Sequence, residues 1–368
     1  MPPMPLINAS QMTLLLNQLG DEAVVRAPLL DNAELFQLDL RQRDAKIEQI
    51  ISSRAYSDAF GTVLERIDAL ATQNGLEPTL VKQVKGELPD YNRLRDAFCQ
   101  AGVEEPTNLH EIRELLRQAR GSNPARGGDI YYFAFDNNTL RNRFYSLYIR
   151  PCSPRDAHYN LLLAKQVRDE LDPREGKILY DFLNAFNTLY PGLSISDIFQ
   201  NQNRLSDRLR LLGLAEWNAV QQSGDAEVED APDARDPDGK IIAAYAKFAQ
   251  KPGRKVVALS SDNEFITRCS GQVNLTGQII KYPKALKSSY TASWEAAGRL
   301  LYQLAILYGR IDIKTAEGLQ TRLYGVWREK GAKEWDQEKL KVTFTPQETP
   351  QEQAIRRNLN ILEKICDS

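Results

Sequence analysis

Histidine and cysteine are scarce in this chain of 368 residues, and their scarcity limits the metal chemistry that it supports. The two histidines, His110 and His158, are too few for a multi-histidine centre, and no HExxH motif occurs. The four cysteines lie far apart and form no CxxC pair, which argues against a cysteine zinc site and a disulfide framework. Any metal ion must therefore be held mainly by carboxylates.

Long apolar runs and nucleotide-binding motifs are also missing. No segment approaches the ~20 apolar residues of a membrane span. No basic residue precedes Arg26, so the N-terminus lacks the positive flank of a secretory signal. The absence of Walker A and GxGxxG motifs argues against a nucleotide-driven motor or a dinucleotide enzyme. We expect a cytoplasmic protein without membrane contacts.

The composition is that of a folded protein, with 42% hydrophobic and 26% charged residues. At roughly 150 residues per domain, the length allows two or three domains. We predict an α/β protein in three parts: a mainly helical N-terminal region over 1–120, a central parallel-sheet domain over 129–282, and a mainly helical C-terminal region over 285–368. The glycine-rich stretch 121–128 (GSNPARGG) is expected to link the first two parts.

Apolar spacing carries the prediction of helical flanks. Leu35, Leu38, Ile47 and Ile50 recur at near-helical intervals, and so do the apolar residues up to the Asn-Gly pair that follows residue 73. Further helices are expected near 293–308 and 351–365. We expect the flanks to gate substrate, to form a homo-oligomer or to bind a protein partner.

The central region alternates between apolar runs typical of strands and apolar spacing typical of helices. Segments 129–135 (DIYYFAF) and 255–259 (KVVAL) are compact apolar runs typical of buried strands, and 279–282 is a third candidate. Segments 161–171 and 177–189 show helical patterns. Such alternation favours a parallel sheet. The acidic segment 221–238 shows no apolar period, and we predict that most of it is a mobile surface loop.

Acidic residues follow the predicted strands. Asp136 ends the first strand (FAFDNNTL) and Asp262 follows the second (ALSSDNEF). Ligands of open α/β sheets bind beyond the carboxyl ends of the strands, so both side chains are placed to hold a cation. Each also suits the N-cap of the next helix. Asp238 begins the helix that feeds the second strand, with Asp236 as the alternative, and Glu170 lies in the segment VRDEL.

These four segments, in this order, resemble the PIN-domain nuclease family. The resemblance covers about 129–282 and neither flank. Family members often carry Thr or Ser after the first Asp, where this chain has Asn137, and the interval between Glu170 and Asp238 is long. The resemblance implies hydrolysis of a phosphodiester, usually in RNA, with Asp136, Glu170, Asp238 and Asp262 as catalytic residues.

Clustered carboxylates repel one another and need a hard divalent cation, so Mg²⁺ or Mn²⁺ is the expected cofactor. We assign Asp136, Asp238 and Asp262 as metal ligands, with Glu170 completing the shell or orienting the water. The expected partner is RNA, with single-stranded DNA as the alternative polymer. The residues expected to hold the substrate are Asn138, Arg141, Arg143, Ser260 and Ser261.

Two other functions remain to be weighed against a nuclease. A phosphatase of the haloacid dehalogenase type would need a second Asp two positions after Asp136, where this chain has Asn138. A catalytically inactive domain of the same fold, acting as an RNA-binding or scaffolding protein, is the serious alternative because a fold does not fix a function.

Overall fold

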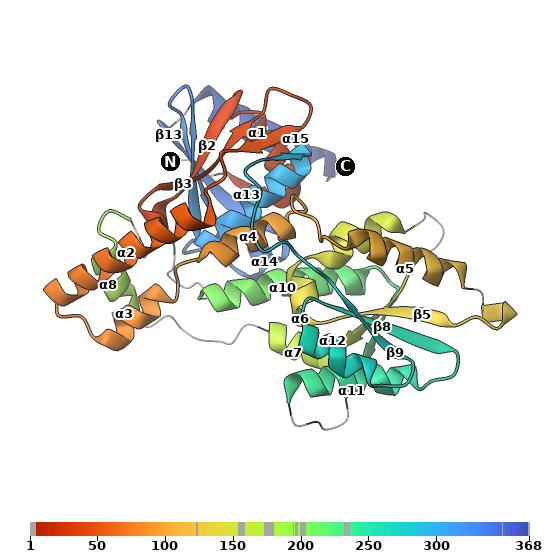
Figure 1. The fold of residues 1–368 in the computed structure, drawn as a ribbon. Helices are drawn as coiled ribbons and strands as arrows, with labels where there is room; N and C mark the ends of the chain where they lie inside the picture. Colours follow the sequence, from red (N-terminus) through yellow and green to blue (C-terminus); the bar gives the residue numbers. More distant parts are fainter. Residues whose placement is uncertain are drawn as a thin grey trace. The chain divides into compact units, whose positions relative to one another are not determined.

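The computed structural model describes residues 5–122, 124–153, 159–172, 180–193, 195, 198, 204–231, 234, 236–347 and 349–366. These residues form two compact units (Figure 1). Unit 1 comprises residues 1–104, 175–208 and 285–368, and unit 2 comprises 105–174 and 209–284.

Unit 1 is built on an eight-stranded sheet in the order β1-β13-β12-β11-β2-β3-β4-β10. All of its strand pairs are antiparallel. The strands are β1 (Leu6–Asn8), β2 (Glu22–Ala27), β3 (Ala33–Asp39), β4 (Ala45–Glu48), β10 (Tyr290–Ala292), β11 (Arg310–Thr315), β12 (Gln320–Tyr324) and β13 (Lys339–Thr345).

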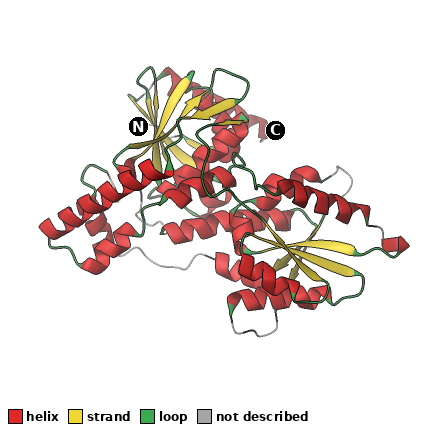
Figure 2. Ribbon diagram, in the orientation of Figure 1, coloured by secondary structure: helices red, strands yellow, loops and turns green. Residues whose placement is uncertain are grey.

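Helices accompany this sheet, as Figure 2 shows in red. They are α1 (Met12–Leu16), α2 (Ser53–Gln73), α3 (Pro78–Lys85), α4 (Tyr91–Gln100), α8 (Tyr180–Leu189), α13 (Trp294–Tyr308), α14 (Ala332–Asp336) and α15 (Pro350–Cys366). Almost every side chain of α13 is buried, which makes it the central helix of the unit. Gly298 allows α13 to approach α1 closely, because a Cβ atom there would lie 2.7 Å from the Cβ of Met12.

The flanks contain these helices, but they also supply all eight strands of the antiparallel sheet, which the sequence analysis did not predict. The helical spacing of Leu35 and Leu38 has a local cause. The β2–β3 register shifts so that Val25 faces Phe36 while Arg26 faces Glu34, which leaves Leu35 as the extra residue of a β-bulge. The bulge buries the adjacent residues Leu35 and Phe36, so a strand acquires a spacing that imitates a helix.

Unit 2 contains a five-stranded sheet in the order β7-β6-β5-β8-β9, with every pair parallel. This confirms the predicted parallel sheet. The strands are β5 (Ile130–Phe135), β6 (Asn160–Ala164), β7 (Ala226–Glu229), β8 (Arg254–Ser260) and β9 (Leu275–Ile279). The helices are α5 (Leu109–Gly121), α6 (Asn137–Arg141), α7 (Lys165–Leu171), α10 (Leu205–Gln222, in this unit from 209 onward), α11 (Pro237–Ala249) and α12 (Asn263–Ser270).

The order of the strands contains a reversal. From β5 the chain moves outward to β6 and β7, then crosses back to β8 and moves outward in the other direction to β9. Crossovers between parallel strands are right-handed, so connections that run in opposite directions lie on opposite faces. Figure 1 shows α11 and α12 on one face and α5 on the other. The carboxyl ends of β5 and β8 thus flank a switch point, where ligands of such sheets bind.

Three boundaries in unit 2 differ from those predicted. The segment 161–171 divides into β6 and α7, because a short apolar run fits a buried strand as well as a helix. The third strand of the prediction lies at 275–279 instead of 279–282. Residues 226–229 form the edge strand β7 instead of a loop.

The strand β7 pairs only with β6, through backbone hydrogen bonds, and its side chains are exposed or half-buried. It therefore carries no apolar run by which the sequence could reveal it. Residues 232, 233 and 235 of the expected acidic loop lie outside the described residues, as do His158, residue 123 of the expected linker and residues 177–179 of the expected helix.

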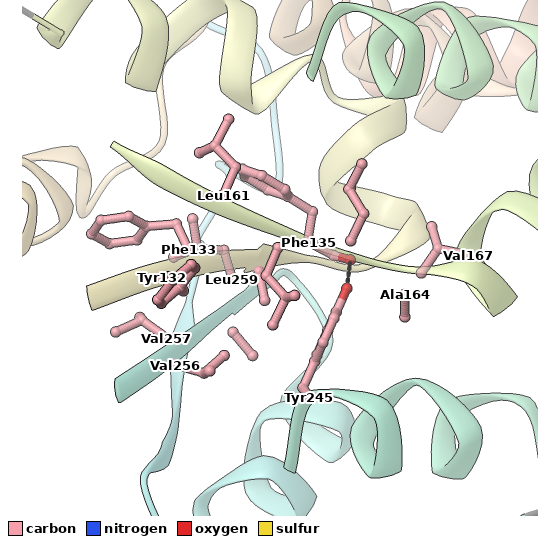
Figure 3. Close-up of a cluster of buried hydrophobic side chains, with 14 of the residues drawn as sticks. Tyr132, Phe133, Phe135, Leu161, Ala164, Val167, Tyr245, Val256, Val257 and Leu259 are labelled. Atoms are coloured by element: carbon pink, nitrogen blue, oxygen red, sulfur yellow. Dashed lines mark hydrogen bonds between the residues drawn. The ribbon is translucent and has the colours of Figure 1, made fainter. Parts of the chain in front are cut away.

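An aromatic and aliphatic core fills the space around the central strands β5, β6 and β8 (Figure 3). Tyr245 of α11 is completely buried in it, and its hydroxyl group donates a hydrogen bond of 2.5 Å to the carbonyl oxygen of Phe135. This bond ties α11 to the last residue of β5. The position of Asp136, which follows directly, is thereby fixed by the core.

Within the described residues, no helix combines the length and apolar composition that crossing a bilayer requires.

Candidate functional site

The site lies at the carboxyl edge of the parallel sheet, where β5 and β8 end. Asp136 is the N-cap of α6, and its Oδ1 accepts a hydrogen bond of 2.7 Å from the backbone N–H of Thr139. Asp262 is the N-cap of α12, and its Oδ1 accepts from the backbone N–H groups of Glu264 and Phe265. Both acids therefore cap a helix at the edge where ligands bind.

Ser260 joins these two acids. Its hydroxyl group donates to Oδ2 of Asp136 at 2.5 Å and accepts from the backbone N–H of Asp262 at 2.9 Å. The side chain is fully buried. Ser260 thus positions the acids from a buried place, where its hydroxyl group is engaged in both of these hydrogen bonds.

The other two predicted acids come from α7 and α11. Glu170 accepts a hydrogen bond of 3.1 Å from the amide nitrogen of Asn137, the residue that follows Asp136. Asp238 lies in the first turn of α11 and is exposed. Four segments that are distant in the sequence thus contribute one carboxylate each to the same edge of unit 2.

The pKa values show that the four carboxylates act on one another. Burial raises the pKa of Asp136 above its ordinary value; hydrogen bonds from Ser260 and Thr139 oppose this effect, and the charge of Asp262 adds to it. Desolvation also raises the pKa of Glu170, and the charges of Asp238 and Asp136 raise it further. The pKa of Asp238 is raised by desolvation first and then by the charge of Asp262. The acids therefore form a ring of mutual repulsion.

Asp236, the alternative to Asp238, is engaged elsewhere. It is the N-cap of α11, and its carboxylate accepts a hydrogen bond of 2.8 Å from the N–H of Gly239. Arg268 of α12 donates to both of its oxygens, at 3.0 and 3.1 Å. The hydrogen bonds from Arg268 and Gly239 lower the pKa of Asp236. Asp236 thus fixes the start of α11 through Gly239 and Arg268. We therefore retain Asp238 as the candidate acid of the site.

The remaining predicted site residues are distributed around this edge. Asn138 is exposed and Ser261 is half-buried. Arg141, at the end of α6, lines a pocket beside Glu170. Arg143 follows with a left-handed backbone (φ 54°) and does not line that pocket. Asn137, Arg210 and Lys240 also line this pocket but were not predicted. Asn137 and Lys240 lie within two positions of predicted acids in the sequence, whereas only the fold brings Arg210 to the site.

The side chains at this edge that could contact a cation are carboxylates. In the described part of the chain, no three His, Cys, Asp or Glu side chains are close enough to hold a metal ion together. Mg²⁺ usually keeps several waters and binds only one or two carboxylates directly, so a Mg²⁺ site does not require three carboxylates at one point. All four candidate ligands are oxygen donors, which favours Mg²⁺ or Mn²⁺ over zinc.

Comparison of the chain with models of known protein families finds no match, and comparison with curated proteins finds none.

Proposed function

We propose that this protein is a metal-dependent nuclease of PIN-like type that hydrolyses phosphodiester bonds in RNA. The observation that carries the proposal is the ring of four mutually repelling carboxylates at the switch point of the parallel sheet. Asp136 is buried, and like charges near a buried carboxylate disfavour its ionised form; a bound cation would offset this repulsion.

The four carboxylates have different expected tasks. Asp136 and Asp262 hold the metal, since Ser260 joins them and their helices fix them. Asp238 would contact the metal through a bound water, and we assign this task to it instead of Asp236, whose oxygens are occupied by Arg268. Glu170, held by Asn137, accepts a proton from the attacking water or orients it. When bound, the metal lowers the pKa of that water and polarises the scissile phosphate.

Cleavage of labelled single-stranded RNA and DNA by the full chain, with Mn²⁺, Mg²⁺ or EDTA, tests this proposal. We expect metal-dependent cutting of RNA that falls by at least about 100-fold in Asp136→Asn, because loss of a ligand charge weakens metal binding and activation. Asp129→Asn is the matched control: it makes the same change in an exposed residue just before β5 and should cut normally.

The alternative function predicts a different outcome. An inactive RNA-binding or scaffolding domain would bind RNA in EDTA and would cleave it with neither Mn²⁺ nor Mg²⁺. Its RNA binding would be unchanged in Asp136→Asn. Cutting that survives this substitution would refute the assignment of the site even if the protein proved to be a nuclease.

A further inference from the structure

A pocket of about 620 Å³ adjoins the acids within unit 2. Its walls come from α6, α7, α10 and the start of α11. Asn137 and Glu170 belong both to this wall and to the acid site, since Asn137 follows Asp136 and binds Glu170. Whatever occupies the pocket therefore lies next to a group held at the acids.

Three cations surround the pocket from three different helices: Arg141 of α6, Arg210 of α10 and Lys240 of α11. The acids in the wall are partly compensated. Asp236 is paired with both terminal nitrogens of Arg268, while Asp169 and Glu170 lie in the wall beside the three cations. Arginine and lysine converging on one hollow are the groups that hold phosphate in proteins.

The size of the pocket favours a ligand larger than a phosphate ion. Pockets for small organic ligands have volumes of about 300 to 1,000 Å³, and this pocket falls in that range. A phosphate alone would leave most of it empty. Guanidinium groups stack on nucleobases, and the ring of Pro237 adds an apolar wall. Phosphate and base together make a nucleotide.

We propose that this pocket binds one nucleotide unit of a single-stranded substrate, adjacent to the phosphodiester held at the acid site. Its place in the reaction rests on the proposed nuclease function. Binding of the nucleotide itself needs no metal, because the cations that hold it are side chains of this chain. Arg210 and Lys240 thereby become substrate-binding residues in addition to Arg141.

Calorimetric titration of the full chain with AMP, adenosine and inorganic phosphate, all in EDTA, tests the pocket. We expect AMP to bind more tightly than adenosine or phosphate. Lys240→Gln should weaken AMP binding by about tenfold or more, because it removes a charge-assisted hydrogen bond, and Lys240→Arg should retain it. The matched control is Lys247→Gln, on the same helix, where Nζ lies 2.6 Å from Glu229 outside the pocket.

The outcomes separate this inference from the proposed function. Lack of saturable AMP binding, or an equal loss in Lys247→Gln, would overturn the pocket assignment. Phosphate that binds as tightly as AMP would overturn the choice of a nucleotide. AMP binding that depends on Lys240 in a protein that cuts no polymer would support the pocket and reject the nuclease. Metal-dependent cutting without AMP binding would do the reverse.

Discussion

At the scale of single residues, Ser260 shows how a small side chain organises a site. One hydroxyl group serves as donor to Asp136 and as acceptor for the backbone of Asp262, so the ends of β5 and β8 are locked at one spacing. The serine is fully buried, and both of its partners cap helices. The geometry of the two central acids thus depends on a residue that is itself buried.

A second buried polar residue, in unit 1, also holds several neighbours through one group. Lys330 is almost fully buried, and its ammonium group donates to the carbonyl oxygens of Gly325 at 2.6 Å and Lys339 at 3.0 Å. The Nζ atom also lies 3.7 Å from the centre of the Trp335 ring and 5.0 Å from that of Trp327. Burial lowers the pKa of Lys330 from 10.5 to about 7.

The shifted pKa makes stability depend on pH. Between about pH 7 and 10.5 the unfolded chain keeps a proton on Lys330 that the folded protein has released, so the free energy of unfolding rises with pH in this window. We expect a gain of up to about 2 kcal/mol from pH 7 to pH 9. Urea unfolding at several pH values measures it. Lys330→Met should lack this gain, and an equal rise in the variant would show that another group causes it.

At the scale of elements, the start of α11 carries two acids two positions apart with different contacts, one that caps the helix and one that we assign to the proposed site. Asp236 caps the helix and binds Arg268 of α12, so it holds two helices together. Asp238 lies in the first turn, exposed, and its raised pKa shows that its charge is disfavoured in the folded protein. The first acid should therefore contribute to stability and the second to function.

Paired alanine substitutions test this division. Asp236→Ala should lower the free energy of unfolding, as loss of an N-cap does. Asp238→Ala should leave stability unchanged or raise it, because an ionised group with a raised pKa opposes folding at neutral pH. Its cleavage rate should fall about 10- to 100-fold. Thermal melts and cleavage assays of both variants decide the matter, and the opposite pattern would identify Asp236 as the site acid.

At the scale of the whole molecule, the two ends of the chain share one sheet. β1 pairs with β13, and β2 pairs with β11, so strands separated by more than 280 residues of sequence are hydrogen-bonded neighbours. The N-terminal region expected from the sequence as a separate helical part is therefore completed by the C-terminal region. Between them, unit 2 carries the candidate site on its own parallel sheet.

Truncation after residue 284 should expose this dependence. It removes β10, β11, β12, β13 and the buried helix α13. This leaves β2 paired only with β3 and uncovers the backbone hydrogen-bonding groups on the edge that β11 covered. We expect residues 1–104 of the truncated chain to be digested by protease under conditions in which they resist in the full chain. Mass spectrometry of timed digests measures this. Equal resistance would mean that the N-terminal region folds alone.

The sequence by itself determined the features that depend on local pattern. Apolar runs bounded by turn residues located β5 and β8, and acids at their ends identified Asp136 and Asp262. The parallel order of the central sheet followed from strands that alternate with helices. Each of these signals lies within about ten consecutive residues, a range over which backbone periodicity leaves a trace.

Only the tertiary structure decided what depends on distant partners. The bulge at Leu35 gave the strand β3 an apolar spacing typical of a helix. The strand β7 has no apolar pattern, because it is held by backbone pairing with β6. The alternation of Leu340, Val342 and Phe344 in β13 was a signal within reach of the sequence. No pattern could show that Arg268 engages Asp236, or that Arg210 and Lys240 meet Glu170 at one pocket, because the fold alone brings these residues together.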